Sequence, residues 1–155
     1  MTVDHLPEGM HQVSPHLICD GAAAAIDFYT EAFGATELMR LELPDGRLMH
    51  AAVAINGSSV MLVDQNEAAG MRSPLLLGGS PVTIHLIVDD AAGWADRAVG
   101  AGATLRMPVT EQFWGDRYGV VEDPFGHVWS IATPTGDVMP AEEMQAAAAR
   151  VEGLG

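Results

Sequence analysis

An internal repeat constrains the fold of this 155-residue chain more than any other feature. The segment His16–Ala23 aligns with His85–Ala92, and six of the eight positions are identical at an offset of 69 residues. Farther along, Gly34–Thr36 matches Gly102–Thr104 at an offset of 68 residues. Because both matches occur in the same order with nearly the same spacing, the sequence predicts two copies of one supersecondary unit.

Each copy begins with a segment that alternates apolar and polar residues, Val13–Asp20 in the first copy and Val82–Asp89 in the second. Alternation with a period of two predicts a strand that packs one face against a core. Further strands are predicted at Thr36–Leu43, Arg47–Ile55, Ser58–Asp64, Thr104–Val109, Tyr118–Glu122 and His127–Thr133.

A helix follows the first strand of each copy, since small and apolar residues recur there at helical spacing. Asp20 and Asp89 stand near the helix starts, where a carboxylate can accept hydrogen bonds from unpaired backbone N–H groups. Gly34 and Gly102 suit left-handed caps at the helix ends.

The predicted fold class is α+β, with two βαβββ modules that form a curved mixed sheet around a cleft. In this arrangement one helix covers one face of each module, and His16 and His85 are related by a pseudo-twofold axis and point into the cleft. The predicted organisation is an N-terminal arm (1–12), a first module (13–66), a connector (67–79), a second module (80–134) and a tail (135–155) with a helix at Ala141–Val151.

Charge and composition limit the classes of partner and the cellular location that are expected for this protein. The chain has 21 acidic residues against 7 Lys plus Arg, for a net charge of −14, so binding to nucleic acid is not expected. No apolar run is long enough to span a membrane, and Met1–Gly9 has no basic region of the kind that begins a signal peptide. A single cysteine, Cys19, cannot form an internal disulfide, which favours a cytoplasmic location.

Three segments resemble a known family. IDFYTEAFGA (Ile26–Ala35) and EDPFGHVWSIAT (Glu122–Thr133) are similar to the vicinal oxygen chelate, or glyoxalase/bleomycin-resistance/dioxygenase, superfamily. QFWGDRYG (Gln112–Gly119) resembles its PhnB-like branch. The resemblance covers about residues 13–134 and implies the paired-module fold. It leaves the activity open, because the superfamily includes isomerases, dioxygenases, thiol transferases and drug-sequestering proteins.

Metal enzymes of this superfamily usually place their ligands on the first and last strand of each module. The resemblance maps those positions to Ser14, Leu62, Thr83 and Ser130. Leucine cannot bind a metal, and three hydroxyl groups do not replace imidazoles and carboxylates. The usual metal site is therefore predicted to be absent, and no cofactor is expected.

A displaced metal site is the alternative. His16, His85 and Asp64 each lie two residues beyond one of the lost positions, and hence on the same strand faces. These side chains are adequate ligands for Zn, Ni, Mn or Fe. The counterpart of Asp64, taken as Ala132, supplies no fourth ligand. Such a site would make the protein a metal-dependent lyase, isomerase or dioxygenase, so whether it is an enzyme stays open.

Other residues are predicted to contact a ligand. His50 faces the cleft in only one of two possible hairpin registers, because a shift of one residue reverses its face. Trp114, Arg117 and Tyr118 belong to an aromatic, polar loop of the kind that borders ligand pockets. His127 is predicted to face away from the cleft in a structural role.

The remaining polar candidates are predicted to be inert. His5 and His11 lie in the arm and are expected to be solvated, whereas Cys19 faces the helix with Leu17 and should not be reactive.

The sequence thus favours a protein that binds an uncharged or cationic small molecule in the cleft without metal. His16, His85 and Asp64 would be its polar anchors, and its apolar wall would comprise Ile18, Ile87, Leu62 and Met49. A homodimer is expected, because free edge strands are a liability for a monomer. A role in which the tail and sheet edges bind another protein is a third possibility. The sequence does not identify the ligand.

Overall fold

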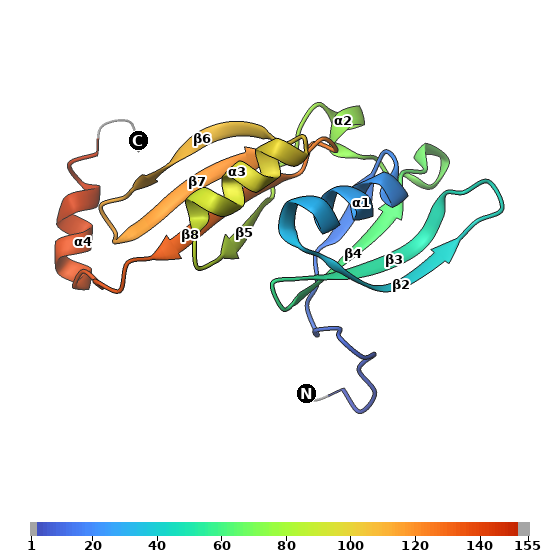
Figure 1. Ribbon diagram of the computed structural model, residues 1–155, viewed down its shortest axis with the longest axis horizontal. Coiled ribbons are helices and arrows are strands. Elements are labelled where there is room, and N and C mark those ends of the chain that lie inside the picture. The colour runs from blue at the N-terminus through green and yellow to red at the C-terminus, as the bar shows by residue number, and fades with distance from the viewer. Residues whose placement is uncertain (1–2, 152–155) are drawn as a thin grey trace.

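The computed structural model describes residues 3–151 and contains two four-stranded sheets (Figure 1). The first sheet has the strand order β1-β4-β3-β2, with β1 parallel to β4 and the other neighbours antiparallel. Its strands are β1 (His16–Cys19), β2 (Thr36–Glu42), β3 (Leu48–Ile55) and β4 (Ser58–Asp64).

The second sheet repeats this topology in the order β5-β8-β7-β6, with β5 parallel to β8. Its strands are β5 (Thr83–Ile87), β6 (Thr104–Glu111), β7 (Asp116–Glu122) and β8 (Val128–Pro134). The predicted α+β fold with two βαβββ units is confirmed. His16 lies opposite Met61 in its ladder and His85 lies opposite Ser130, so the offset of 69 holds for both paired strands.

One helix covers each sheet, α1 (Ala22–Phe33) the first and α3 (Ala91–Ala101) the second, and the two helices lie on the same side of the molecule (Figure 1). Both end at glycines of positive φ, Gly34 at 64° and Gly102 at 125°, as predicted.

The predicted caps at the helix starts are wrong. The N-cap residue of α3 is Asp90, whose carboxylate accepts from the N–H of Gly93, and not Asp89. The N-cap residue of α1 is Gly21, which has no side chain to cap the helix, and Asp20 does not cap it either. The acceptor comes from another strand and belongs to the site described below.

Smaller elements complete the chain. The connector contains η1 (Glu67–Ala69) and α2 (Pro74–Leu77), and the tail contains α4 (Ala141–Ala148), shorter by three residues than predicted. Residues 1–2 of the predicted arm and 152–155 of the predicted tail lie outside the described residues. Within residues 3–151, no helix is both long enough and apolar enough to cross a membrane.

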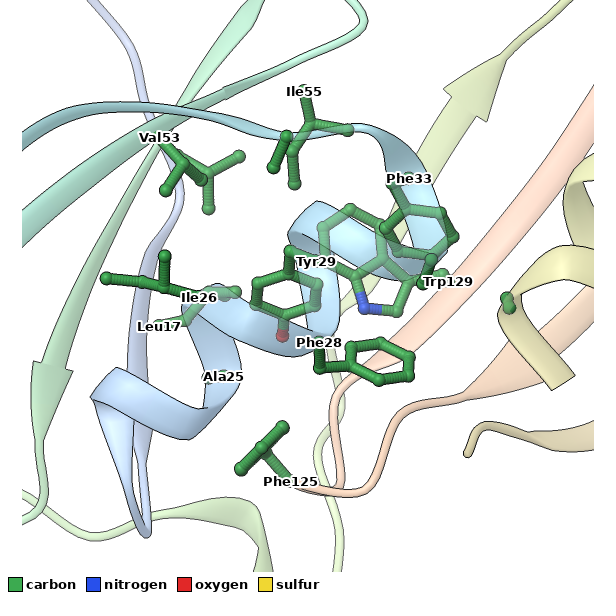
Figure 2. Close-up of a cluster of buried hydrophobic side chains, with 14 of the residues drawn as sticks. Leu17, Ala25, Ile26, Phe28, Tyr29, Phe33, Val53, Ile55, Phe125 and Trp129 are labelled. Atoms are coloured by element: carbon green, nitrogen blue, oxygen red, sulfur yellow. The ribbon is translucent and has the colours of Figure 1, made fainter. Parts of the chain in front are cut away.

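The hydrophobic core is continuous between the two modules (Figure 2). The ring of Trp129, from β8, lies 5.0 Å from that of Phe33 and 5.3 Å from that of Tyr29, both on α1. The ring of Trp94, on α3, stacks on that of Phe33 with centroids 6.1 Å apart. Trp129 is therefore a fully buried core residue, and the partly buried Trp94 packs against the core.

A buried carboxylate joins the modules within this core. Asp123, in the β7–β8 turn, accepts hydrogen bonds from the hydroxyl of Tyr29 and from Nε1 of Trp129, the latter at 2.9 Å. It also accepts from the backbone N–H groups of Phe125 and His127 at 2.9 and 3.0 Å. Four donors from both modules thus compensate one desolvated charge.

Two side chains reach reciprocally from one module to the other. Nε2 of His127 donates to the carbonyl of Ile18 on β1 at 3.0 Å, which is a structural contact. His127 also lines the pocket between β1 and β5 that is described below, so the prediction that it faces away from the cleft is wrong. Nδ2 of Asn56 donates to the carbonyl of Ile87 on β5 at 2.8 Å. The two acceptors, Ile18 and Ile87, are 69 residues apart and therefore equivalent in the repeat, whereas the two donors are not equivalent. The two contacts hold the edge strands β1 and β5 at the module boundary.

We expect Asp123→Ala to lower the free energy of unfolding by about 3 kcal/mol, because it leaves buried donors of both modules without an acceptor. Urea denaturation followed by circular dichroism measures the change. The control Asp96→Ala removes an exposed carboxylate of α3 and should leave the midpoint unchanged. Equal stability of the two variants would contradict the role assigned to Asp123.

Candidate functional site

A pocket of about 520 Å³ lies where β1 and β5 face each other. It is lined by residues 15–17 and 82–85 together with Ser80 and His127, and we call it the seam pocket. It contains both His16 and His85, the histidines that the repeat places in equivalent positions. Ser80 and Val82 were not predicted as lining residues: Ser80 lies before the predicted strand, and the alternation places Val82 with Leu86 on the core face.

The strand pattern explains why both imidazoles are available to this pocket. Leu17 and Leu86 are buried in the core, whereas the neighbouring His16 and His85 are exposed. Successive side chains of a strand point to opposite faces, so both histidines lie on the sheet faces away from the helices.

His50 shares the face of His16. The two rings lie edge to face with centroids 6.4 Å apart, which selects the register that places His50 on the face of His16. His50 is not among the residues that line the seam pocket. Partial burial, and then the positive charge that His50 can carry, lower the pKa of His16 below its ordinary value of 6.5. His16 is therefore a neutral imidazole at pH 7, able to donate and to accept hydrogen bonds.

Among residues 3–151, His85 is not paired with a second histidine; its neighbours are Ser130 and Tyr118. Its Nδ1 lies 2.7 Å from the hydroxyl of Ser130, and its ring stacks on Tyr118 with centroids 6.0 Å apart. Trp114 packs edge-on against Tyr118 at 5.7 Å, and its Nε1 donates to Asp116 at 3.1 Å. Trp114 and Tyr118 thus form an aromatic row beside His85, but neither lines the seam pocket. Trp114 instead lines a separate pocket of about 490 Å³ together with α4.

Asp64 does not line the seam pocket, contrary to the prediction; it borders a separate pocket of about 310 Å³ that His16 also lines. Its carboxylate accepts from the N–H groups of Gly21, Ala22 and Leu48 at 3.1, 3.0 and 2.7 Å. It therefore caps α1 from the neighbouring strand. In the second module the hydroxyl of Thr133 accepts from the N–H of Ala91 at 2.8 Å. The repeat counterpart of Asp64 is accordingly Thr133, and not Ala132.

The prediction that Arg117 contacts a ligand in the cleft is also wrong. It lies opposite Thr133 in the β7–β8 ladder, next to Tyr118, so its side chain is on the other face of the sheet. There it lines a separate pocket of about 310 Å³ with Asp89 and Asp90. Arg117 therefore does not contact a ligand that lies beside His85.

None of the four predicted wall residues lines the seam pocket, whose apolar wall is formed by Pro15, Leu17, Val82 and Ile84. Leu62 is completely buried and points into the core, while Ile18, Ile87 and Met49 are partly or largely exposed. The residue opposite His16, in the place that Ser130 takes opposite His85, is Met61.

The predicted three-residue metal site is not assembled. Asp64 is occupied by three backbone donors, and the described part of the chain has no group of three His, Cys, Asp or Glu side chains placed to hold a metal ion. Ser14, at a usual ligand position of the family, instead lies 2.6 Å from the hydroxyl of Ser59.

Two other side chains have structural surroundings. Cys19 is fully buried, and burial, with Asp123 and Asp64 nearby, raises the pKa of its thiol, so it is not a nucleophile at neutral pH. His11 is exposed as expected, but its Nδ1 also contacts Ser59 at 3.2 Å and ties the arm to β4.

Comparison with known proteins assigns the family. The model of the Glyoxalase/Bleomycin resistance protein/Dioxygenase superfamily matches residues 9–131, so the chain belongs to this superfamily. An uncharacterized protein of Mycobacterium tuberculosis is 54% identical over 138 residues, which cover 87% of this chain and 81% of that protein.

Solved structures share the fold. An Arabidopsis thaliana gene product is 31% identical, with a TM-score of 0.64, and the match covers 79% of this chain and 98% of that one. The putative 3-demethylubiquinone-9 3-methyltransferase, PhnB protein, of Bacillus cereus is 16% identical, with a TM-score of 0.61 and coverage of 79% and 99%. The PhnB branch is thus a distant match that shows the fold alone.

The pairing of His16 with His50 leads to a pH prediction. We expect His50→Ala to raise the pKa of His16 toward 6.5, because it removes the like charge that disfavours protonation. Titration of the imidazole nitrogens by two-dimensional ¹H–¹⁵N NMR measures it. His85→Ala, which changes the other module, should not move the pKa of His16. A His16 midpoint that is the same with and without His50 would contradict the assigned contact.

Proposed function

We propose that the protein binds an uncharged small molecule in the seam pocket and needs no metal to do so. The observation that carries this proposal is the convergence of His16 and His85, from repeat-related strands, on one pocket. Typical ligand sites combine a concave, mostly apolar wall with a few placed polar groups.

The chemistry of the lining supports an uncharged ligand. The polar side chains are imidazoles and hydroxyls, which donate and accept hydrogen bonds, and none of the lining residues is acidic or an arginine. Without Asp64 the pocket has no local carboxylate for a cation, while the net charge of −14 disfavours an anion.

The family is consistent with this proposal, because its members typically bind small molecules and form dimers. The alternative metal-dependent enzyme at His16, His85 and Asp64 loses one of its three ligands to the cap of α1.

We expect His16→Ala and His85→Ala to weaken binding to a similar extent, by about 1–3 kcal/mol each, because each removes a hydrogen-bond partner of the ligand. A library of uncharged heteroaromatic fragments, screened and titrated by ligand-observed NMR, supplies the probes. Arg117→Ala, on the other face of the second sheet, is the matched control and should bind like the wild type.

The proposal would be contradicted by a stoichiometric divalent metal in protein purified without a histidine tag, if that metal is lost in both histidine variants. Elemental analysis of the same samples detects it and would favour the enzyme over the binding protein.

We further propose a homodimer. The outer strands β2 and β6 have unpaired edges, and the exposed apolar residues on them include Met39, Leu41 and Leu105. A second copy would cover such edges. Light scattering should therefore give about twice the chain mass of 16.3 kDa. A mass of one chain at micromolar concentration would rule the dimer out.

A further inference from the structure

We infer that the ligand of the seam pocket is a short peptide segment in extended conformation, recognised by the main chain of β1 and β5. This inference rests on the proposed function and names the chemical class of its ligand. It follows from the directions of the backbone groups on the two strands.

On β1, the hydrogen bonds to β4 fix these directions. The carbonyls of Pro15 and Cys19 accept from Met61 and Gln65 of the first sheet, at 2.8 and 2.9 Å. Backbone groups alternate in direction along a strand, so His16 and Ile18 direct theirs away from β4. The hydrogen bond that the carbonyl of Ile18 accepts from His127 of the other module is consistent with this direction.

On β5, the same reasoning holds. The N–H of Val88, just beyond β5, donates to the carbonyl of Ala132 on β8 at 2.9 Å. Alternation then directs the backbone of His85 and Ile87 away from β8. The carbonyl of Ile87 accepts from Asn56 of the first module, which confirms the direction.

The seam pocket therefore has a strand edge on each side. Each sheet ends at its edge strand, and within residues 3–151 β1 does not pair with β5. The carbonyls of Ile18 and Ile87 are already used by His127 and Asn56. The groups left for a ligand are centred on His16 and His85, so the segment that fits is short.

A peptide matches such edges better than other neutral ligands do. Each of its residues offers one N–H and one C=O, the groups that a strand edge pairs with in β-augmentation. The peptide backbone is uncharged, as are the hydroxyls that line the pocket. The side chains of His16 and His85 lie next to those edges, where they can contact alternate side chains of the bound segment.

Proline substitutions distinguish binding by the main chain of the strands from binding by the histidine side chains. His85→Pro removes both the imidazole and the outward N–H, whereas the matched variant His85→Ala removes only the imidazole. Proline is tolerated on an edge strand when its nitrogen faces away from the ladder. His16→Pro and His16→Ala make the same comparison on β1.

The probes are blocked tripeptides with neutral side chains, titrated into ¹⁵N-labelled protein by NMR. We expect the tightest of them to bind each proline variant about tenfold more weakly than the alanine variant at the same position. We also expect it to lose about tenfold in affinity for the wild type when its central amide is N-methylated. Circular dichroism and light scattering check the fold and the mass of each variant.

The inference would be overturned if the proline and alanine variants bound the tripeptide with equal affinity. It would also be overturned if the wild type bound the N-methylated and the unmethylated tripeptide with equal affinity. If a proline variant does not fold, the affinity of the wild type for the N-methylated peptide still tests whether the main chain recognises the ligand. A proline variant that changes only the oligomer mass would show that a second copy occupies the edge, which also overturns it. If uncharged fragments bind at His16 and His85 but no tripeptide does, this inference fails and the proposed function stands. If nothing binds there, both fail.

Discussion

The buried carboxylate of Asp123 is the interaction on which the rest of the structure depends. It accepts hydrogen bonds from Tyr29 of the first module and from Trp129 of the second, inside a core where an uncompensated charge would be costly. This arrangement fixes one module against the other. The distance between β1 and β5, and with it the seam pocket, follows from that constraint and from the contacts of His127 and Asn56.

The repeat and the strand alternation were sufficient to predict the fold and to bring His16 and His85 together, because both signals are carried along the chain itself. The role of Asp64 could not be predicted in this way. It caps α1 only because β1 pairs with β4 in parallel, which is a tertiary contact. The one available signal was Gly21, which has no side chain to cap the helix that follows it.

Arg117 illustrates a different error. Tyr118 and Arg117 were assigned together to a loop, but β7 already begins at Asp116. Adjacent residues of a strand face opposite sides, so only one of the two can border the site. The face of His50 depended on a register that the sequence leaves open, and its contact with His16 decides it.

The two halves have diverged at the positions that surround the histidines. His50 stands beside His16 where Tyr118 stands beside His85, and Met61 lies opposite His16 where Ser130 lies opposite His85. The two histidines of the seam pocket therefore have chemically different surroundings. The most direct test is a crystallographic screen of the native protein with neutral amide-containing fragments. We predict fragment density between β1 and β5 in contact with both histidines. Pairing of β1 with β5 in the crystal, or fragments bound only elsewhere, would contradict the account.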